Sequence, residues 1–356
     1  MLALTRSRLS APNGLNSNAS RLIPDTPQQR HSRPRLAVTA RLASPGLRHS
    51  GNFAPRQGPG ASRLFSSARA EPVLAGTAPY HSAYVLLHTH APVAEYPSRS
   101  KSPLWRALTI RARQWGGVIN FAWAPEAWQA VHPAYAGLGE PGGRSFWGEG
   151  KENRDGDGEG EEAYVASVFS SAHPTGRFVI PEVTLANLDA IDASLRALAR
   201  GDSPSAAEKL ANDDPQEAKV AVEEAVGHRE KLFLYVCTHG SRDCRCGDCG
   251  GDVARALERE IDRRGVGQDV FLGEVAHVGG HKYAANILVY PSGDWLGSVQ
   301  ESDVPQVVDE LLAWHASHRL SSFADSPPLC PRFWRGRMGL DKEDQIALHS
   351  KPVGAR

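Results

Sequence analysis

Two short loops carry most of the metal-ligand side chains in this chain, and each follows a stretch typical of a buried strand. The first loop, 237–249, contains four of the five cysteines, and the second, 277–281, reads His-Val-Gly-Gly-His. The apolar, β-forming runs 231–236 and 270–276 directly precede them. Because both loops leave the end of a predicted strand, their side chains are expected to meet at one edge of a sheet. The pattern predicts a metal or cluster site.

Length and composition narrow the class of protein. The chain has 356 residues, of which 41% are hydrophobic, which is enough for two or three domains with apolar cores. No apolar run approaches the roughly 18 residues that a membrane-spanning helix needs, so no membrane span is expected. Five cysteines, four of them crowded into one loop, make a poor disulfide framework for a chain of this length. Ligation or redox chemistry fits them better.

The first 70 residues differ in composition from the rest. They hold eleven arginines, no lysine and one acid, Asp25, with many Ser, Ala and Pro. This composition is typical of a mitochondrial transit peptide, and Arg-Leu-Phe-Ser-Ser at 63–67 resembles a matrix-protease cleavage site. We therefore expect a mitochondrial protein, with the matrix favoured over the intermembrane space. Removing this segment leaves 29 basic and 39 acidic residues, a net charge near −10, so no nucleic-acid binding is expected.

The rest of the chain repeats one order of predicted elements: strand, helix, strand, strand, strand, helix. The first copy comprises 84–87, 102–115, 118–123, 164–169, 177–180 and 184–199, and the second comprises 231–236, 252–264, 270–276, 283–290, 295–299 and 304–318.

This order is thioredoxin-like, and it predicts an α/β fold of two such halves, each a mixed sheet with helices on both faces. The first loops align, Leu-Leu-His88-Thr-His90 with Tyr-Val-Cys237-Thr-His239. The N-terminal copy has no cysteine and is interpreted as degenerate.

The predicted domain boundaries follow from shifts in composition. After the presequence, 1–70, we expect a degenerate domain at 80–200 that carries an acidic, Gly-rich surface insertion at about 125–162. A charged, Ala-rich linker at 201–228, with a helical second half, separates it from the second domain at 229–320. Residues 321–356 are expected to be a C-terminal tail.

Residue chemistry alone leaves several kinds of site open. Cys237-Thr-His239 matches half of a Rieske box, but the second loop has no cysteine, which argues against a strict Rieske protein. Cysteine and histidine also suit a structural Cys2His2 zinc site. Cys246-Gly-Asp-Cys249 fits the C-x-x-C of dithiol enzymes, so a thiol-disulfide oxidoreductase that uses Cys244, Cys246 and Cys249 remains an alternative.

A family resemblance rests on three motifs: Val-Cys237-Thr-His-Gly-Ser-Arg-Asp-x-Arg-Cys246-Gly, His277-Val-Gly-Gly-His281-Lys-Tyr-Ala-Ala-Asn286, and Trp295-Leu-Gly. Together they resemble the sucrase/ferredoxin-like family of thioredoxin-like ferredoxins, over roughly residues 80–340. With its presequence, the chain is most similar to the mitochondrial branch. The resemblance implies that the C-terminal half is a ferredoxin domain and that Cys237, Cys246, His277 and His281 hold a [2Fe-2S] cluster.

The resemblance also implies a function. It indicates an electron carrier or redox protein that serves an unidentified redox partner protein, rather than a hydrolytic or group-transfer enzyme. Two neutral imidazoles in place of thiolates are expected to raise the cluster potential and to couple electron uptake to a proton.

Other residues near the motifs fall outside this ligand set. Cys244 and Cys249 are expected to be spectator thiols, and His239 and Arg242 are expected to fix the loop rather than bind iron. Cys330 has no predicted partner, and the neighbouring Trp-Arg-Gly-Arg segment, 334–337, is expected to be surface coil.

Overall fold

The computed structural model describes residues 73–124, 162–211, 223–224, 231–318 and 326–351. All of them belong to one compact unit, residues 69–356. The predicted presequence, nearly all of the acidic insertion and most of the predicted linker lie outside the described residues. None of the described helices combines the length and the apolarity that crossing a bilayer requires.

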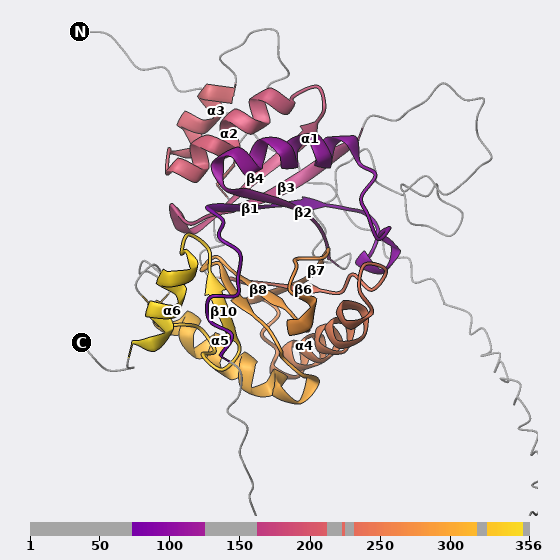
Figure 1. Ribbon diagram of the computed structural model, residues 1–356, viewed down its shortest axis with the longest axis vertical. Helices are drawn as coiled ribbons and strands as arrows, with labels where there is room; N and C mark the ends of the chain where they lie inside the picture. Colours follow the sequence, from indigo (N-terminus) through magenta and orange to yellow (C-terminus); the bar gives the residue numbers. More distant parts are fainter. Residues whose placement is uncertain (1–72, 125–161, 212–222, 225–230, 319–325, 352–356) are drawn as a thin grey trace, which may run out of the picture. The chain divides into compact units, whose positions relative to one another are not determined.

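In the described part of the N-terminal half, strands and helices follow one another in the predicted order (Figure 1). They are β1 (Ala83–His88), α1 (Pro103–Ala112), β2 (Gly117–Trp123), β3 (Ala163–Ser170), β4 (His173–Thr184) and α2 (Leu188–Arg200). In the sheet they stand in the order β4-β3-β1-β2, with β1 parallel to β2 and antiparallel to β3.

The C-terminal half repeats this arrangement. Its elements are β6 (Leu232–Cys237), α4 (Gly251–Arg264), β7 (Val270–Val275), β8 (Ile287–Tyr290), β9 (Asp294–Leu296) and α5 (Val304–His318). The strand order is β9-β8-β6-β7, with β6 parallel to β7 and antiparallel to β8. Both halves therefore have the same thioredoxin-like topology, which confirms the predicted fold class.

The central strand of each half is buried along its whole length. β1 reads Ala-Tyr-Val-Leu-Leu-His and β6 reads Leu-Phe-Leu-Tyr-Val-Cys, and every position in both is buried. Alternate side chains of β1 enter different cores: Val85 and Leu87 pack with α1 and α2, whereas Tyr84 and Leu86 pack with residues of the C-terminal half. A strand covered on both faces loses the alternation of polar and apolar residues, which explains the continuous apolar runs.

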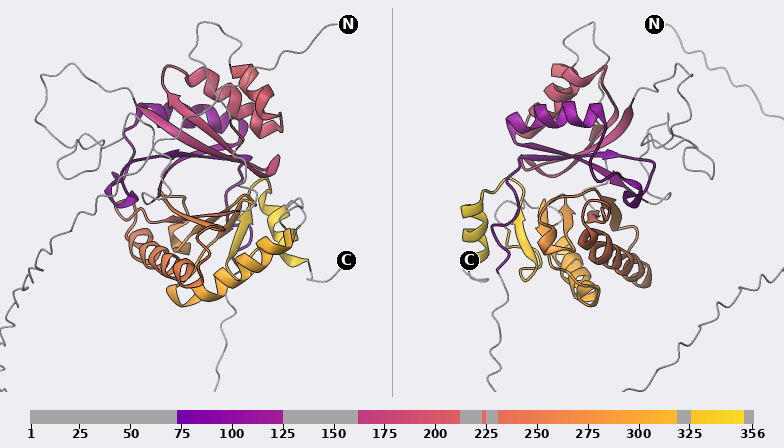
Figure 2. Two further views of the ribbon diagram at one scale, coloured as in Figure 1. Left: turned by 180° about the vertical axis from the view of Figure 1, so that it is seen from behind. Right: turned by 45° about the vertical axis from the view of Figure 1, so that its right-hand side comes forward.

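The second face of each half-sheet is covered by the other half, not by helices. β2 pairs with β7 through Ala122 and Trp123, so the two half-sheets form one ten-stranded sheet. Aromatic rings fill the core between the half-sheets, where Phe169 stacks on Tyr290 with their ring centroids 4.1 Å apart. The helices α4 and α5 share a core on the opposite face of the C-terminal strands (Figure 2). The expectation of helices on both faces of each half is therefore wrong.

The described residues also form two further helices and two further strands, beside short helical turns. They are α3 (Pro204–Ala211), β5 (Glu223–Glu224), β10 (Trp334–Arg337) and α6 (Lys342–Ser350). Within the predicted linker range the described helix, α3, stands at the start, and its Ala207 carbonyl accepts a hydrogen bond from Ser194 of α2 at 2.9 Å. The expectation of surface coil at 334–337 is wrong, because β10 pairs with β9 and all four of its residues are buried.

Candidate metal centre

Cys237 is the last residue of β6, and its surroundings leave it almost no freedom. The residue is 1% exposed, and its backbone N–H donates to the carbonyl of Asn286 at 3.0 Å. Gly250, where a π-helical turn meets α4, lies so close that a Cβ there would stand 2.1 Å from the Cys237 carbonyl oxygen. Only glycine allows this approach. The turn thus fixes Cys246, its first residue, beside the end of β6.

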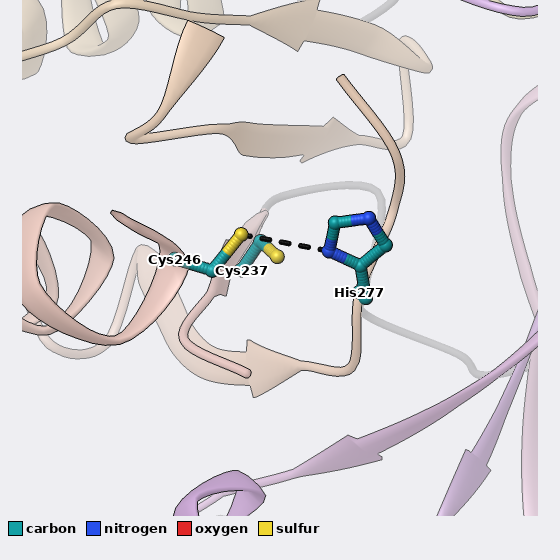
Figure 3. Close-up of side chains that lie close together, drawn as sticks. All are labelled: Cys237, Cys246 and His277. Atoms are coloured by element: carbon teal, nitrogen blue, oxygen red, sulfur yellow. Dashed lines mark hydrogen bonds between the residues drawn. The ribbon is translucent and has the colours of Figure 1, made fainter. Parts of the chain in front are cut away.

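His277 reaches the same point from the loop after β7. The ligand atoms of Cys237, Cys246 and His277 all lie within 4.8 Å of one another, and Nδ1 of His277 is 3.5 Å from Sγ of Cys246. Figure 3 shows the imidazole facing the two cysteines through this nitrogen, while its other ring nitrogen points away. Three of the four predicted ligands therefore converge.

The fourth predicted ligand, His281, lies beside this group and not within it. Its ring is stacked on that of His277, with centroids 5.9 Å apart. Its Nδ1 is 3.5 Å from a carboxylate oxygen of Asp243, and its side chain is 48% exposed. Asp243 belongs to the first loop, so this contact connects the two loops across the site. Arg245, hydrogen-bonded to Asp243, holds the pKa of that carboxyl down at about 2.

The two cysteines are electrostatically coupled. The hydrogen bond from Cys246 lowers the pKa of Cys237, with smaller support from the backbone N–H groups of Val278 and His239. The same hydrogen bond, together with burial, raises the pKa of Cys246. Within this pair, Cys237 is therefore the cysteine that loses its proton more easily, and thiolate is the form of cysteine that binds metal.

His239 ties the site to the N-terminal half. The backbone N–H of His277 donates to its Nδ1 at 3.2 Å, so its Nε2 carries the proton that is donated to the carbonyl of Pro97 at 3.1 Å. Burial lowers the pKa of this imidazole, which keeps it neutral. Arg242 makes a parallel contact by donating to the carbonyl of Ser98 at 3.3 Å. Both geometries are those of loop-fixing residues, as the sequence predicted.

The most informative residue that the sequence reasoning missed is Arg335, on β10. It is 2% exposed, and its guanidinium donates to Asn286 Oδ1 at 2.7 Å and to the carbonyl of Thr77 at 2.7 Å. It also packs directly under the second loop, because a Cβ on Gly280 would stand 2.5 Å from its Nη2. Burial lowers the pKa of Arg335 to about 10, and the charges of Tyr283 and, to a smaller degree, Cys237 oppose that shift. The described residues include no carboxylate paired with it.

The remaining cysteines stand apart from this group. Cys244 and Cys249 are exposed and Cys330 is buried, and all three are free thiols. Cys330 packs in the core beneath α5, where its Sγ lies 3.9 Å from the carbonyl of Val307 and burial raises its pKa.

Fold and site together define a thioredoxin-like protein with a candidate metal site, made of two buried cysteines and a half-buried histidine, at the ends of two parallel strands. The profile of the sucrase/ferredoxin-like family matches residues 74–322, which is more than half of the chain. The chain belongs to the sucrase/ferredoxin-like family.

Several known proteins are similar to parts of the chain. Actin patches distal protein 1 of Saccharomyces cerevisiae is 33% identical over 96 residues, which is 24% of this chain and 30% of that protein. Altered inheritance of mitochondria protein 32 of Meyerozyma guilliermondii is 39% identical over 83 residues (22% and 29%), and that of Debaryomyces hansenii is 36% identical over 87 residues (23% and 31%). The matches thus span less than a third of these relatives.

Among solved structures, a thioredoxin-like [2Fe-2S] ferredoxin from Aquifex aeolicus matches 36% of this chain and 99% of its own length. The sequence identity is 16% and the TM-score is 0.24.

Proposed function

We propose that this protein is a [2Fe-2S] electron-transfer protein, and that Cys237, Cys246, His277 and His281 hold its cluster. The observation that carries the proposal is the convergence of two cysteines and one histidine, with ligand atoms within 4.8 Å, at the ends of β6 and β7. A second imidazole, that of His281, stacks on the first. Two cysteines and two histidines form a ligand set that [2Fe-2S] clusters accept.

Asp243 supports a ligand role for His281. Metal-bound histidines usually donate their other ring N–H to a carboxylate, which fixes the ring and its tautomer. The Asp243 carboxylate lies on the Nδ1 side of His281, so Nε2 is the nitrogen left for iron. When bound, the cluster would supply one-electron redox chemistry. The protein's part is to bury the two cysteines and to leave the histidine side closer to solvent.

We place this activity in mitochondria, with a separate redox protein as partner. The support is the arginine-rich, acid-poor composition of residues 1–70 and the mitochondrial name of several relatives.

Metal and sulfide analysis of anaerobically purified protein tests the proposal. We expect about two iron and two acid-labile sulfide per chain, the composition of the cluster. Cys246→Ser should remove most of both, whereas the matched change Cys249→Ser, at an exposed cysteine three residues on, should leave them in place. One zinc per chain without sulfide would instead establish the structural zinc site.

The thiol-disulfide alternative has its own test. It needs a free attacking thiol, and the exposed Cys244 and Cys249 are the available ones. We expect the doubly changed protein, Cys244→Ser with Cys249→Ser, to keep both its iron content and its capacity to accept and donate electrons. Loss of activity with iron retained would support the dithiol mechanism and contradict the electron-carrier proposal.

A further inference from the structure

A cavity of about 480 Å³ opens beside His277, and both halves of the protein build it. The N-terminal half supplies the segment 96–100, Trp105 of α1 and Phe121 of β2. The C-terminal half supplies residues of the two loops, among them Arg242 and His277. Its volume lies in the range of small-molecule sites. The half without cysteines therefore forms a wall of a cavity that contains a proposed iron ligand.

The inner wall of the cavity is aromatic and ordered by packing. Trp105 is stacked near Phe121, with centroids 6.2 Å apart and planes inclined by 27°, and Tyr96 meets Phe121 edge-on at 6.1 Å. The indole N–H of Trp105 is bound to the carbonyl of Ile119 at 3.1 Å, which fixes the ring. Tyr96 and Phe121 are buried behind Trp105, which is the partly exposed ring of this wall. A fixed, partly exposed indole favours a flat aromatic ligand by offset stacking.

The charge at the cavity is positive. Arg99 and Arg242 are exposed residues of its lining, and none of the described residues that line it is acidic. Arg242 is held in place by its hydrogen bond to the carbonyl of Ser98. Beyond residue 70 the chain has ten more acidic than basic residues. A lining with two arginines and no acid therefore differs in charge from the rest of this part of the chain. Guanidinium groups suit a phosphate or another anion.

We propose that this cavity binds a flat aromatic molecule that carries a negative charge, of the class of flavin mononucleotide, with the ring on the aromatic wall and the anion at Arg99 and Arg242. The ligand would be a small-molecule redox partner, a role that rests on the proposed function. A cluster held by Cys237, Cys246, His277 and His281 would, when reduced, supply one electron to this ring; the cluster would be oxidised as the ring is reduced, with no covalent bond formed or broken. The N-terminal half thus serves as the ligand-binding half.

Flavin mononucleotide and riboflavin share a ring and differ in the phosphate, so the pair isolates the charge. We would titrate each into the purified full-length protein and follow quenching of flavin fluorescence. Saturable binding of flavin mononucleotide, tighter than that of riboflavin, is expected. Arg242→Gln and Arg99→Gln should each weaken flavin mononucleotide about two- to fivefold, the range for an exposed ion pair, and leave riboflavin unchanged. The exposed Lys101 is close in sequence but outside the lining, so Lys101→Gln should change neither.

Two results would overturn the proposal: no saturable binding of flavin mononucleotide, or equal affinities for the two flavins that neither arginine change alters. Iron and sulfide measured on the same samples distinguish a failure of the cavity proposal from a failure of the cluster proposal. Iron-loaded protein that binds no flavin refutes the cavity proposal alone. Flavin binding by protein without iron refutes the cluster proposal and leaves the cavity site standing.

Discussion

A buried ion pair at the C-terminal strand gives the sharpest prediction about stability. Asp294 is fully buried and Arg337 is 2% exposed, and they are joined by hydrogen bonds of 3.0 and 3.3 Å. The guanidinium also donates to two backbone carbonyls, and Asp294 accepts one more bond, from the Trp334 indole, at 2.6 Å. Changing Arg337 to Met would leave a buried carboxylate with a single strong donor. Removing one partner of a buried pair costs about 3–5 kcal/mol, a large part of the roughly 5–15 kcal/mol that stabilises a domain.

Urea denaturation followed by tryptophan fluorescence measures this loss. The matched control is Arg332→Met, which breaks an exposed pair with Asp303 at 3.4 Å and should cost no more than about 1 kcal/mol. The double change Asp294→Asn, Arg337→Met should cost less than the sum of the two single changes, because Asp294→Asn removes the charge that Arg337→Met alone would leave unpaired. If the free energy of unfolding of Arg337→Met lies within about 1 kcal/mol of the wild-type value, β10 does not form its buried contacts with Asp294.

The centre and the groups that support it give three more expectations. Arg335→Gln should lower the midpoint potential of the centre by tens of millivolts, up to about 59 mV for a tenfold change in a one-electron equilibrium, because a buried cation beside the site favours the reduced state. Arg335→Lys keeps the positive charge and should leave the midpoint potential close to that of the wild type. Equal potentials for wild type and Arg335→Gln in redox titrations would contradict this. Gly250→Ala should abolish iron binding, since the new Cβ would collide with the backbone carbonyl of Cys237. Gly251→Ala is the control and should retain iron, because its Cβ would meet only the flexible side chain of Arg255. Iron analysis of the two variants tests this. Burial lowers the pKa of His81 to about 4 and that of His88 to about 3, so both imidazoles stay neutral in the folded protein. The unfolded chain binds protons below about pH 6.5, so the free energy of unfolding should fall below that pH by up to about 1.4 kcal/mol per pH unit for each histidine. Equal stability in urea denaturation at pH 7 and pH 5 would contradict this.

Periodicity and the strand-end loops make much of this protein predictable. Continuous apolar runs mark β1 and β6, and the position of the two loops at strand ends predicts that their cysteines and histidines meet at one sheet edge; the choice of Cys237, Cys246 and His277 among them comes from the family resemblance. These signals are local in sequence, so sequence reasoning finds them.

The missed features depend on contacts between distant residues. Arg335 and Arg337 have the sequence context of surface residues in a Pro-rich tail, because charged side chains are rarely buried unless they are paired. Their partners, Asn286 and Asp294, stand 49 and 43 residues away. The sequence predicts helices on both faces of each sheet because nothing in either half alone shows that the other half covers its second face.

Pulsed electron paramagnetic resonance of the anaerobically purified, chemically reduced protein is the decisive experiment for the proposed ligand set, because it detects nitrogen bound to the spin-bearing iron. With His277 and His281 as ligands, we expect a [2Fe-2S] signal that is strongly coupled to two nitrogen nuclei, one of which is lost in His277→Cys. A cluster signal without strong nitrogen coupling, or a colourless protein that contains zinc and gives no signal, would contradict the assignment of these histidines to iron.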